Sequence, residues 1–343
     1  MQQAVLAVVF LGILVMFHEI GHFVAGRILG VFIHEFSIGF GPAILSWVRG
    51  ETRYSLRIIP LGGYVRFAGE EGSGKEEDNK VPRERLLYSQ SPGRRAFIVF
   101  SGPLMNLIVA SVAFFLVFSF IGIARPTTVV GEVVPGYPAE KSGVQPGDRV
   151  LKVEDVTVVE WQDMVKVVQR RAGIPTRLSL QRGSQTVEVT VVPVEMGGQG
   201  VIGVKASLTV VRLGLVEGLV AGVKETVLVS VAWARGIFAM ISGKVAPEVT
   251  GPVGISQLLG EAARMGLSQL FYLVGALSAN LGLINLLPVP ALDGSRLLFA
   301  GLEAIRGKPI DPEKESFVHF VGFFLLMILF VVITYKDILR LIR

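Results

Sequence analysis

The chain has 343 residues, of which 51% are hydrophobic and only 18% are charged, whereas soluble globular chains carry about 25% charged residues. The chain has no cysteine, which excludes disulfides, thiolate nucleophiles and cysteine-ligated zinc, so any metal must bind histidine, aspartate or glutamate. The net charge of +5 comes without a basic patch interleaved with aromatic residues, so we expect no nucleic-acid partner.

Four stretches are apolar enough to cross a bilayer, which takes about 20 residues. They are residues 4–29, 96–124, 265–292 and 317–335. The first has no basic segment before it and no small-residue cleavage site after it, so we interpret it as a retained helix rather than a signal peptide.

A fifth apolar stretch, residues 213–242, carries charges that a spanning helix rarely has. At 100° per residue, Glu217, Lys224 and Arg235 fall within about 20° of one another. One charged stripe on an apolar helix predicts a helix that lies in the membrane interface, and a further span is the alternative.

Basic residues indicate the orientation of the spans. The loop between the third and fourth spans carries four of them, and the loop between the first and second carries many more: Arg27, Arg49, Arg53, Arg57, Arg66, Lys75, Lys80, Arg83, Arg85, Arg94 and Arg95. Basic loops stay in the cytoplasm, so we expect residues 125–264 outside a bacterial inner (cytoplasmic) membrane. The basic C-terminal tail, residues 336–343, argues weakly against this orientation.

His18, Glu19 and His22 form an H-E-x-x-H motif in the second half of the first span. Residues four apart share one face of a helix, so the two imidazoles can bind one zinc ion. Glu19 can act as general base toward a water on that metal. Three polar residues on an ordinary helix surface are the alternative, but a central acid in a membrane helix costs about 2.5–3.5 kcal/mol, which favours a functional role.

A catalytic zinc usually has three protein ligands, so a third residue is expected. Asp293 is the best candidate, because it follows NLLPVPAL at 285–292, where two prolines break the third span and free backbone carbonyls. The loop charges place both His18 and Asp293 toward the cytoplasmic side. His34 and His319 are isolated in the sequence, and an interfacial helix-end aspartate is the alternative for Asp293.

The paired motifs, HEIGH at 18–22 and NLLPVPALDG at 285–294, resemble those of the site-2 protease family of intramembrane metalloproteases, and more closely its bacterial regulator-of-sigma-E branch. The resemblance extends to FSIGFGP at 36–42, PLGGYV at 60–65, SGPLMN at 101–106 and GPVGI at 251–255. It implies one zinc ion per chain with His18, His22 and Asp293 as ligands and Glu19 as general base. It also implies that Asn285 and Asn106 position substrate or donate hydrogen bonds in the transition state. A buried amide that packs helices is the alternative for each asparagine.

Residues 33–67 are rich in β-formers and turn glycines, and segments 55–59 and 64–67 flank Pro60-Leu-Gly-Gly63, which predicts a β-hairpin. The family resemblance makes this a membrane-associated β element, about residues 33–68, beside the site. Its edge could pair with an unwound substrate strand, and a purely structural hairpin is the alternative.

Residues 127–193 have short β-type runs, turns and ordinary charge density, which indicates a water-soluble module. VVGEVVPGYPAEKSGVQPGDRVLKVEDVTV at 129–158 resembles a PDZ domain, with 161–171 as the helix that lines its groove. PDZ domains capture peptide ends by strand addition, so a substrate segment or peptide C-terminus is the expected ligand. A steric filter and a spacer without ligand are alternatives. Longer members of the branch carry two such modules, whereas this chain has room for one.

We therefore expect an α-helical integral membrane protein with four transmembrane helices, a membrane-associated β element and an inserted α+β PDZ domain. The predicted parts are 1–124 with two spans, the PDZ domain at 125–195, a linker with the interfacial helix at 196–264, and 265–343 with two more spans. The expected function is intramembrane zinc-dependent proteolysis of single-pass membrane proteins, such as anti-sigma factors or signal-peptide remnants, in contact with membrane lipid.

Two rival functions stay open. A PDZ-bearing membrane scaffold with a vestigial metal site would not need the intact HEIGH motif that the sequence retains. A transporter that couples ions through buried histidine and aspartate would be expected to show paired broken helices in two inverted repeats, and the sequence contains no such pair.

Overall fold

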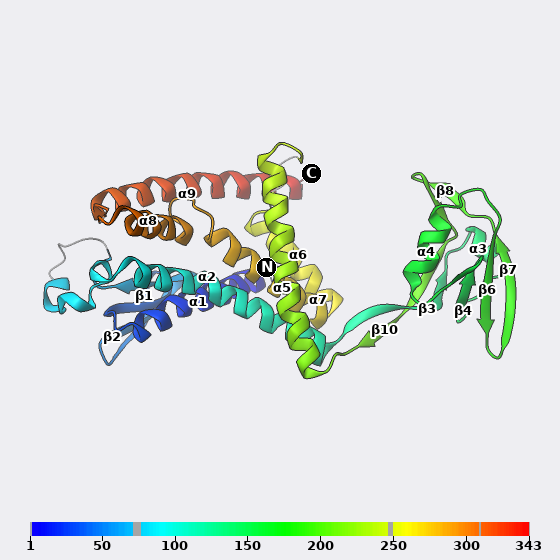
Figure 1. Cartoon of the computed structure of the whole chain (residues 1–343), viewed down its shortest axis with the longest axis horizontal. Helices are drawn as coiled ribbons and strands as arrows, with labels where there is room; N and C mark the ends of the chain where they lie inside the picture. The colour runs from blue at the N-terminus through cyan, green and yellow to red at the C-terminus, as the bar shows by residue number, and fades with distance from the viewer. Residues whose placement is uncertain (1, 71–76, 246–249, 309, 343) are drawn as a thin grey trace. The chain divides into compact units, whose positions relative to one another are not determined.

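The computed structural model describes residues 2–70, 77–245, 250–308 and 310–342, and its contacts divide the chain into two compact units (Figure 1). The first unit combines Met1–Ile121 with Gly214–Arg343, and the second is Gly122–Leu213.

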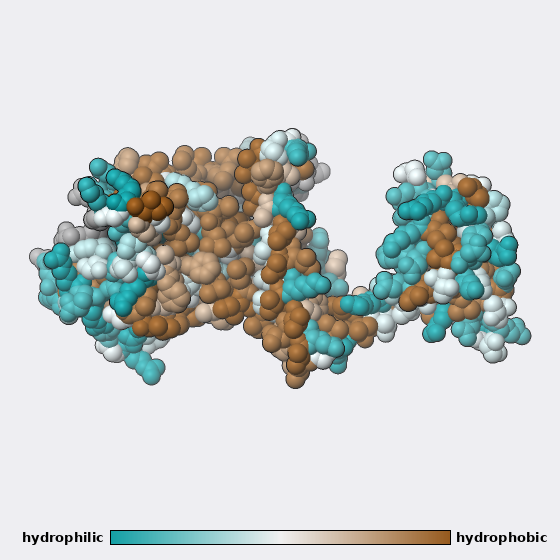
Figure 2. Space-filling model, viewed as in Figure 1, coloured by the Kyte–Doolittle hydropathy of each residue, from teal (hydrophilic) through white to brown (hydrophobic). Residues whose placement is uncertain are grey.

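Within the described residues of the first unit, four helices are long and apolar enough to cross a membrane, at Val8–Ile28, Pro92–Ile121, Leu267–Asn285 and Lys314–Arg340. They belong to α1 (Gln2–Ile28), α2 (Pro92–Leu116) with a π-helical end at Val117–Ile121, α7 (Leu267–Asn285) and α9 (Pro312–Ile342). Apolar side chains cover the middle of this unit in Figure 2, as contact with lipid requires. The four predicted apolar helices are confirmed, and the chain is a multi-pass membrane protein.

The third span is shorter than the predicted range 265–292. Met265 ends α6 (Pro252–Met265), and Gly266, with φ +118°, separates α6 from α7. Helix α7 ends at Asn285, and α8 (Asp293–Arg306) begins only after a non-helical segment. Pro288 and Pro290 account for the early end, because neither can donate the N–H that a helix needs.

Small residues bring three of the membrane helices close together. A Cβ at Gly21 of α1 would lie 2.2 Å from the carbonyl oxygen of Ser101 in α2, and one at Gly282 of α7 would lie 2.9 Å from the carbonyl oxygen of Pro103. Only glycine permits such approaches, which are typical of helix packing in lipid. The HEIGH and SGPLMN motifs therefore lie side by side.

The β element consists of β1 (Ile33–Arg49) and β2 (Thr52–Phe67). The tight turn joins them at Gly50, with φ +65°, and Glu51, so the predicted turn at 60–63 does not make the hairpin. Ser37 of β1 pairs with both Ser55 and Tyr64 of β2. The start of β1 therefore pairs with both of the segments, 55–59 and 64–67, that were predicted to pair with each other. The pairing prediction was wrong because β1 competes for both segments.

Short 3-10 turns follow at Asp78–Lys80, Arg83–Arg85 and Leu87–Ser89 before α2. Helix α5 (Leu215–Ile241) corresponds to the predicted interfacial stretch and is not among the four candidate spans. It packs on α2 through Gly218, Gly222 and Thr226, and Thr226 exchanges a hydrogen bond of 3.0 Å with Ser111. In Figure 1 it runs across the direction of α2 and α9.

The second unit contains a six-stranded antiparallel sheet in the order β10-β3-β4-β6-β7, with β5 beside β4. Its strands are β3 (Ile123–Val133), β4 (Arg149–Val153), β5 (Val156–Thr157), β6 (Thr176–Arg182), β7 (Gln185–Val191) and β10 (Val204–Val211), and β8 (Val194–Met196) pairs separately with β9 (Gln199–Val201). Two helices accompany them, α3 (Pro138–Lys141) and α4 (Trp161–Gln169). Trp161, Met164 and Val168 of α4 join the buried core with Leu178 and Leu180 of β6.

This unit extends beyond the range 125–195 predicted for the inserted domain. Strand β10 falls in the predicted linker 196–264, yet it pairs along β3, from Val204 opposite Val133 to Val211 opposite Ile123. The β-type residues of β10 therefore complete the sheet instead of forming an open connection.

Candidate metal centre

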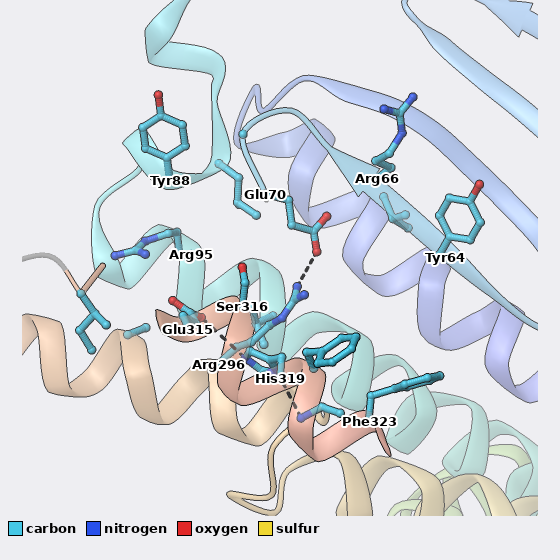
Figure 3. Close-up of a pocket in the computed structure, with 18 of the residues that line it drawn as sticks. Tyr64, Arg66, Glu70, Tyr88, Arg95, Arg296, Glu315, Ser316, His319 and Phe323 are labelled. Carbon is cyan, nitrogen blue, oxygen red and sulfur yellow. Dashed lines mark hydrogen bonds and ion pairs between the residues drawn. The ribbon is translucent and has the colours of Figure 1, made fainter. Parts of the chain in front are cut away.

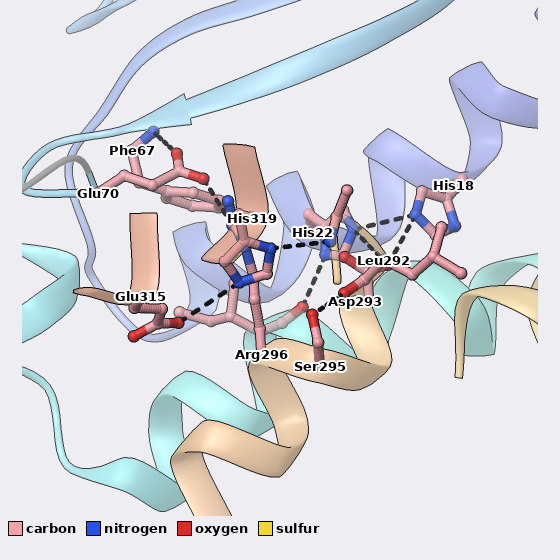
Figure 4. A network of polar contacts seen from close by, with 12 residues as sticks. His18, His22, Phe67, Glu70, Leu292, Asp293, Ser295, Arg296, Glu315 and His319 are labelled. Carbon is pink, nitrogen blue, oxygen red and sulfur yellow. Dashed lines mark hydrogen bonds and ion pairs between the residues drawn. The ribbon is translucent and has the colours of Figure 1, made fainter. Parts of the chain in front are cut away.

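Three side chains converge where α1 meets the start of α8 (Figure 4). The Nε2 atoms of His18 and His22 lie 3.2 Å apart, and Oδ2 of Asp293 lies 3.0 Å from the first and 3.4 Å from the second. The exposed fractions of the three side chains are only 8%, 12% and 18%. The structure thus brings together two turns of the first span and a carboxylate from the far end of the chain.

The spacing of these atoms fits one zinc ion. Ligands about 2.0–2.2 Å from a tetrahedral zinc lie about 3.3 Å from one another, close to the three observed separations. Nδ1 of His22 donates to the carbonyl oxygen of Ile98 at 2.9 Å, which leaves the lone pair of neutral His22 on Nε2, facing the cluster. Within the described residues, the buried Oδ2 of Asp293 has no hydrogen-bond partner. A buried carboxylate oxygen needs a positive partner, and a cation held between the three side chains would supply it.

Gly102 of α2 makes room for both imidazoles. A Cβ at this position would lie 2.3 Å from Nε2 of His22 and 2.9 Å from Cε1 of His18. Gly102 was not predicted to have a role, although it lies in the SGPLMN motif. A glycine inside an apolar helix was the available signal, because such a residue marks a close approach.

Asn106 lies behind His18 and not in the cavity with the cluster. It is fully buried, with 0% exposure, and its amide nitrogen is 3.1 Å from Nδ1 of His18. An amide can donate through Nδ2 or accept through Oδ1, so it can satisfy Nδ1 in either imidazole tautomer. The geometry therefore ties Asn106 to the orientation of His18 and gives it no contact surface for substrate.

Glu19 and Asn285 line a cavity of about 400 Å³ together with the three clustered side chains. The backbone of β2 passes close to Glu19, since a Cβ at Gly63 would lie 3.5 Å from Cγ of Glu19. The β element is thus beside the site. Of the two lone histidines, His34 is 2.7 Å from Asp78, and His319 accepts a hydrogen bond from the backbone of Ala291, so neither belongs to the cluster.

A second cavity of about 1100 Å³ adjoins the first, and both are lined by Tyr64, Glu70 and Arg296 (Figure 3). Arg296 of α8 donates to Glu70 at 2.6 Å, which links α8 to the chain just after β2. The nearby Glu70 carboxylate raises the pKa of the Arg296 guanidinium, which therefore stays charged. This ion pair forms part of the wall between the two spaces.

The chain matches the family model described as Peptidase family M50 over residues 6–329. Its similar proteins include a zinc metalloprotease RasP from Oceanobacillus iheyensis, with 32% identity over 99% of this chain and 100% of the relative. A putative zinc metalloprotease from Clostridium acetobutylicum shows 37% identity over 97% of this chain and 96% of the relative. The Regulator of sigma-W protease RasP from Bacillus subtilis shows 29% identity over 97% of each.

Proposed function

Because the chain belongs to peptidase family M50 and is an intramembrane zinc metalloprotease, we propose that His18, His22 and Asp293 hold its zinc ion and that Glu19 is its general base. The observation that carries this assignment is the convergence of the three ligand atoms, 3.0–3.4 Å apart, in the cavity that Glu19 also lines. No other group of three or more potential ligands occurs within the described residues.

Held by His18, His22 and Asp293, zinc would supply Lewis-acid chemistry: it would polarise the scissile carbonyl and lower the pKa of a water molecule toward about 7. Glu19 accepts the proton of the attacking water and later donates a proton to the leaving amine. Asn285, which lines the same cavity, donates its amide N–H to the substrate carbonyl and so positions the peptide. Asn106 holds the His18 ring, and the carbonyl of Ile98 holds the His22 ring.

The proposed substrates are single-pass membrane proteins, such as anti-sigma factors or signal-peptide remnants. Residues of the membrane helices α1, α2 and α7 line part of the cavity, which supports a substrate segment that comes from the bilayer or its edge. One relative is named as a regulator of a sigma factor, which favours an anti-sigma factor as the substrate class. A helical substrate must unwind before cleavage, and the edge of the β element beside Glu19 offers strand pairing to the unwound segment.

The test uses purified protein in detergent with a panel of transmembrane peptides, and products are mapped by mass. We expect cleavage inside or at the edge of the apolar segment, loss of cleavage with a chelator, and recovery on adding zinc. Glu19→Gln should keep the zinc and lose the cleavage. Full biological activity of Glu19→Gln would support a scaffold instead, and a wild-type protein without bound zinc would support a transporter.

We further propose that the metal centre faces the cytoplasm and that Gly122–Leu213 lies outside it, because basic residues concentrate between the first two spans. The chain has no cysteine, so single cysteines can report the side directly. In intact bacterial cells, an impermeant maleimide should label Gln185→Cys and should reach Arg83→Cys only after lysis. The reverse pattern would invert the orientation.

For the unit Gly122–Leu213 we propose a PDZ-like module that recognises a substrate segment or a peptide C-terminus. Its strand β10 lies at the end of the sheet order, with β3 as its one neighbour in the described residues, so its other edge can accept a peptide strand. Peptides with a free C-terminus should bind the full chain more tightly than the same peptides with an amidated C-terminus. Equal binding, or none, would favour a steric filter or spacer.

A further inference from the structure

The segment that leads into Asp293 contains an unusual backbone conformation. The φ angle of Ala291 is +73°. Among the described residues, Glu154 is the one other non-glycine residue with a positive φ. The Cβ of alanine disfavours this left-handed region, so the conformation persists only where neighbouring groups hold it. A group that fixes the backbone of Ala291 also fixes the direction in which the chain continues to Asp293, two residues later.

His319 of α9 provides that group. Its Nδ1 accepts the backbone N–H of Ala291 at 3.1 Å, and its ring packs against Phe299 of α8, with centroids 6.0 Å apart. In Figure 4, His319 faces the segment that carries Leu292 and Asp293. A histidine in a membrane helix is costly unless it has a function, and among residues 317–334 it is the one ionisable side chain.

The contact of α9 with the loop has a second point. A Cβ at Gly322, three residues after His319, would lie 2.3 Å from Cβ of Pro290 and 2.7 Å from its carbonyl oxygen. Gly322 thus allows the α9 backbone to approach the residue next to Ala291. Two contacts from α9 therefore fix this segment: Gly322 packs against Pro290, and His319 accepts the hydrogen bond from Ala291.

We propose that His319 is a positioning residue for the zinc site, which acts through the backbone of Ala291 to aim Asp293 at His18 and His22. This inference rests on the proposed function, because it takes Asp293 as a ligand. A metal ligand must be held to within about 0.5 Å, and a loop that carries two prolines and a left-handed alanine does not hold such a geometry without support. His319 itself does not belong to the cluster of potential ligands.

The test compares two substitutions in full-length detergent-solubilised protein. His319→Phe keeps an aromatic ring against Phe299 but removes the acceptor, whereas His319→Asn places Oδ1 near the position of Nδ1. Zinc affinity is measured by competition with a chelator, and unfolding of the metal-free protein is measured in parallel. We expect His319→Phe to lose about 10–100-fold in zinc affinity, the usual effect of removing an outer support, with metal-free unfolding little changed. His319→Asn should stay within about threefold of wild type, and Phe330→Leu, at an exposed position of the same helix, is the control.

A second variant separates positioning from other roles. Ala291→Gly adopts the left-handed conformation without help, so it should restore part of the zinc affinity lost in His319→Phe. Wild-type zinc affinity in His319→Phe, or equal losses in His319→Phe and His319→Asn, would overturn the inference while leaving the proposed function intact. A wild-type chain that binds no zinc would overturn both.

Discussion

Nε2 of His22 lies so close to the α-carbon of Gly102 that a single added methyl group would sit 2.3 Å from it. Gly102→Ala should therefore displace the imidazoles of His18 and His22 and lower zinc affinity by about 10–100-fold or more. Gly93→Ala, on the same helix with nothing within 4 Å of the added Cβ, is the control and should bind zinc as the wild type does. Chelator competition measures both. Normal zinc affinity in Gly102→Ala would show that the two helices do not approach as closely as the structure has them.

Asn106 provides a test between holding a ligand and touching substrate. Asn106→Leu keeps the volume but removes the partner of His18 Nδ1, so zinc affinity should fall about 10–100-fold while the KM for peptide changes little. Asn106→Asp keeps an acceptor for an Nδ1–H and should retain most of the affinity. A rise in KM with unchanged zinc affinity in Asn106→Leu would instead support direct substrate contact.

The parts of this protein that depend on local patterns were predictable from sequence. The apolar spans follow from residue composition, and the pairing of His18 with His22 follows from helical periodicity. Asp293 was a candidate ligand because the proline-broken motif before it places a carboxylate at membrane depth. Each inference needs only a short window of residues.

What escaped prediction depends on contacts between distant segments. The role of Gly102 appears only when α2 is laid against α1, and the hydrogen bond from Ala291 to His319 joins a loop to a separate span. In the β element, Gly50 and the glycines at 62–63 carry similar turn signals, and the competition for β1 decides between them. A single sequence contains no measure of such competition.

The packing of α5 on α2 can be tested at a glycine on the contact face. A Cβ at Gly222 would lie 2.7 Å from the carbonyl oxygen of Ser111 and 2.9 Å from the amide nitrogen of Phe115. Gly222→Leu should therefore destabilise the first unit by about 1–3 kcal/mol, the usual cost of overpacking, measured by unfolding in mixed micelles. Gly236 lies on the same helix with nothing within 4 Å, so Gly236→Leu should be close to neutral. Equal effects of the two variants would show that α5 does not dock through this face.

The second unit contains a buried carboxylate whose ionisation makes its stability depend on pH. Asp148 is 1% exposed and accepts two hydrogen bonds of 2.8 Å from Arg182, which lower the pKa of its carboxyl. A carboxyl with a lower pKa in the folded than in the unfolded state adds stability above its unfolded value, about 3.9. That stability is lost as the pH falls from there through the folded pKa.

Asp148→Asn should therefore destabilise Gly122–Leu213 by about 1.5–3 kcal/mol at neutral pH, the value of hydrogen bonds to a charged group, and should flatten its loss of stability in acid. Hydrogen exchange of peptides from this unit in the full chain measures both effects. Glu132→Gln breaks the ion pair with Lys205, whose side chains are 57% and 64% exposed, and it should cost at most about 1 kcal/mol. If Asp148→Asn kept the acid sensitivity of the wild type, another carboxyl would have to be responsible, because the amide has no proton to gain in this range.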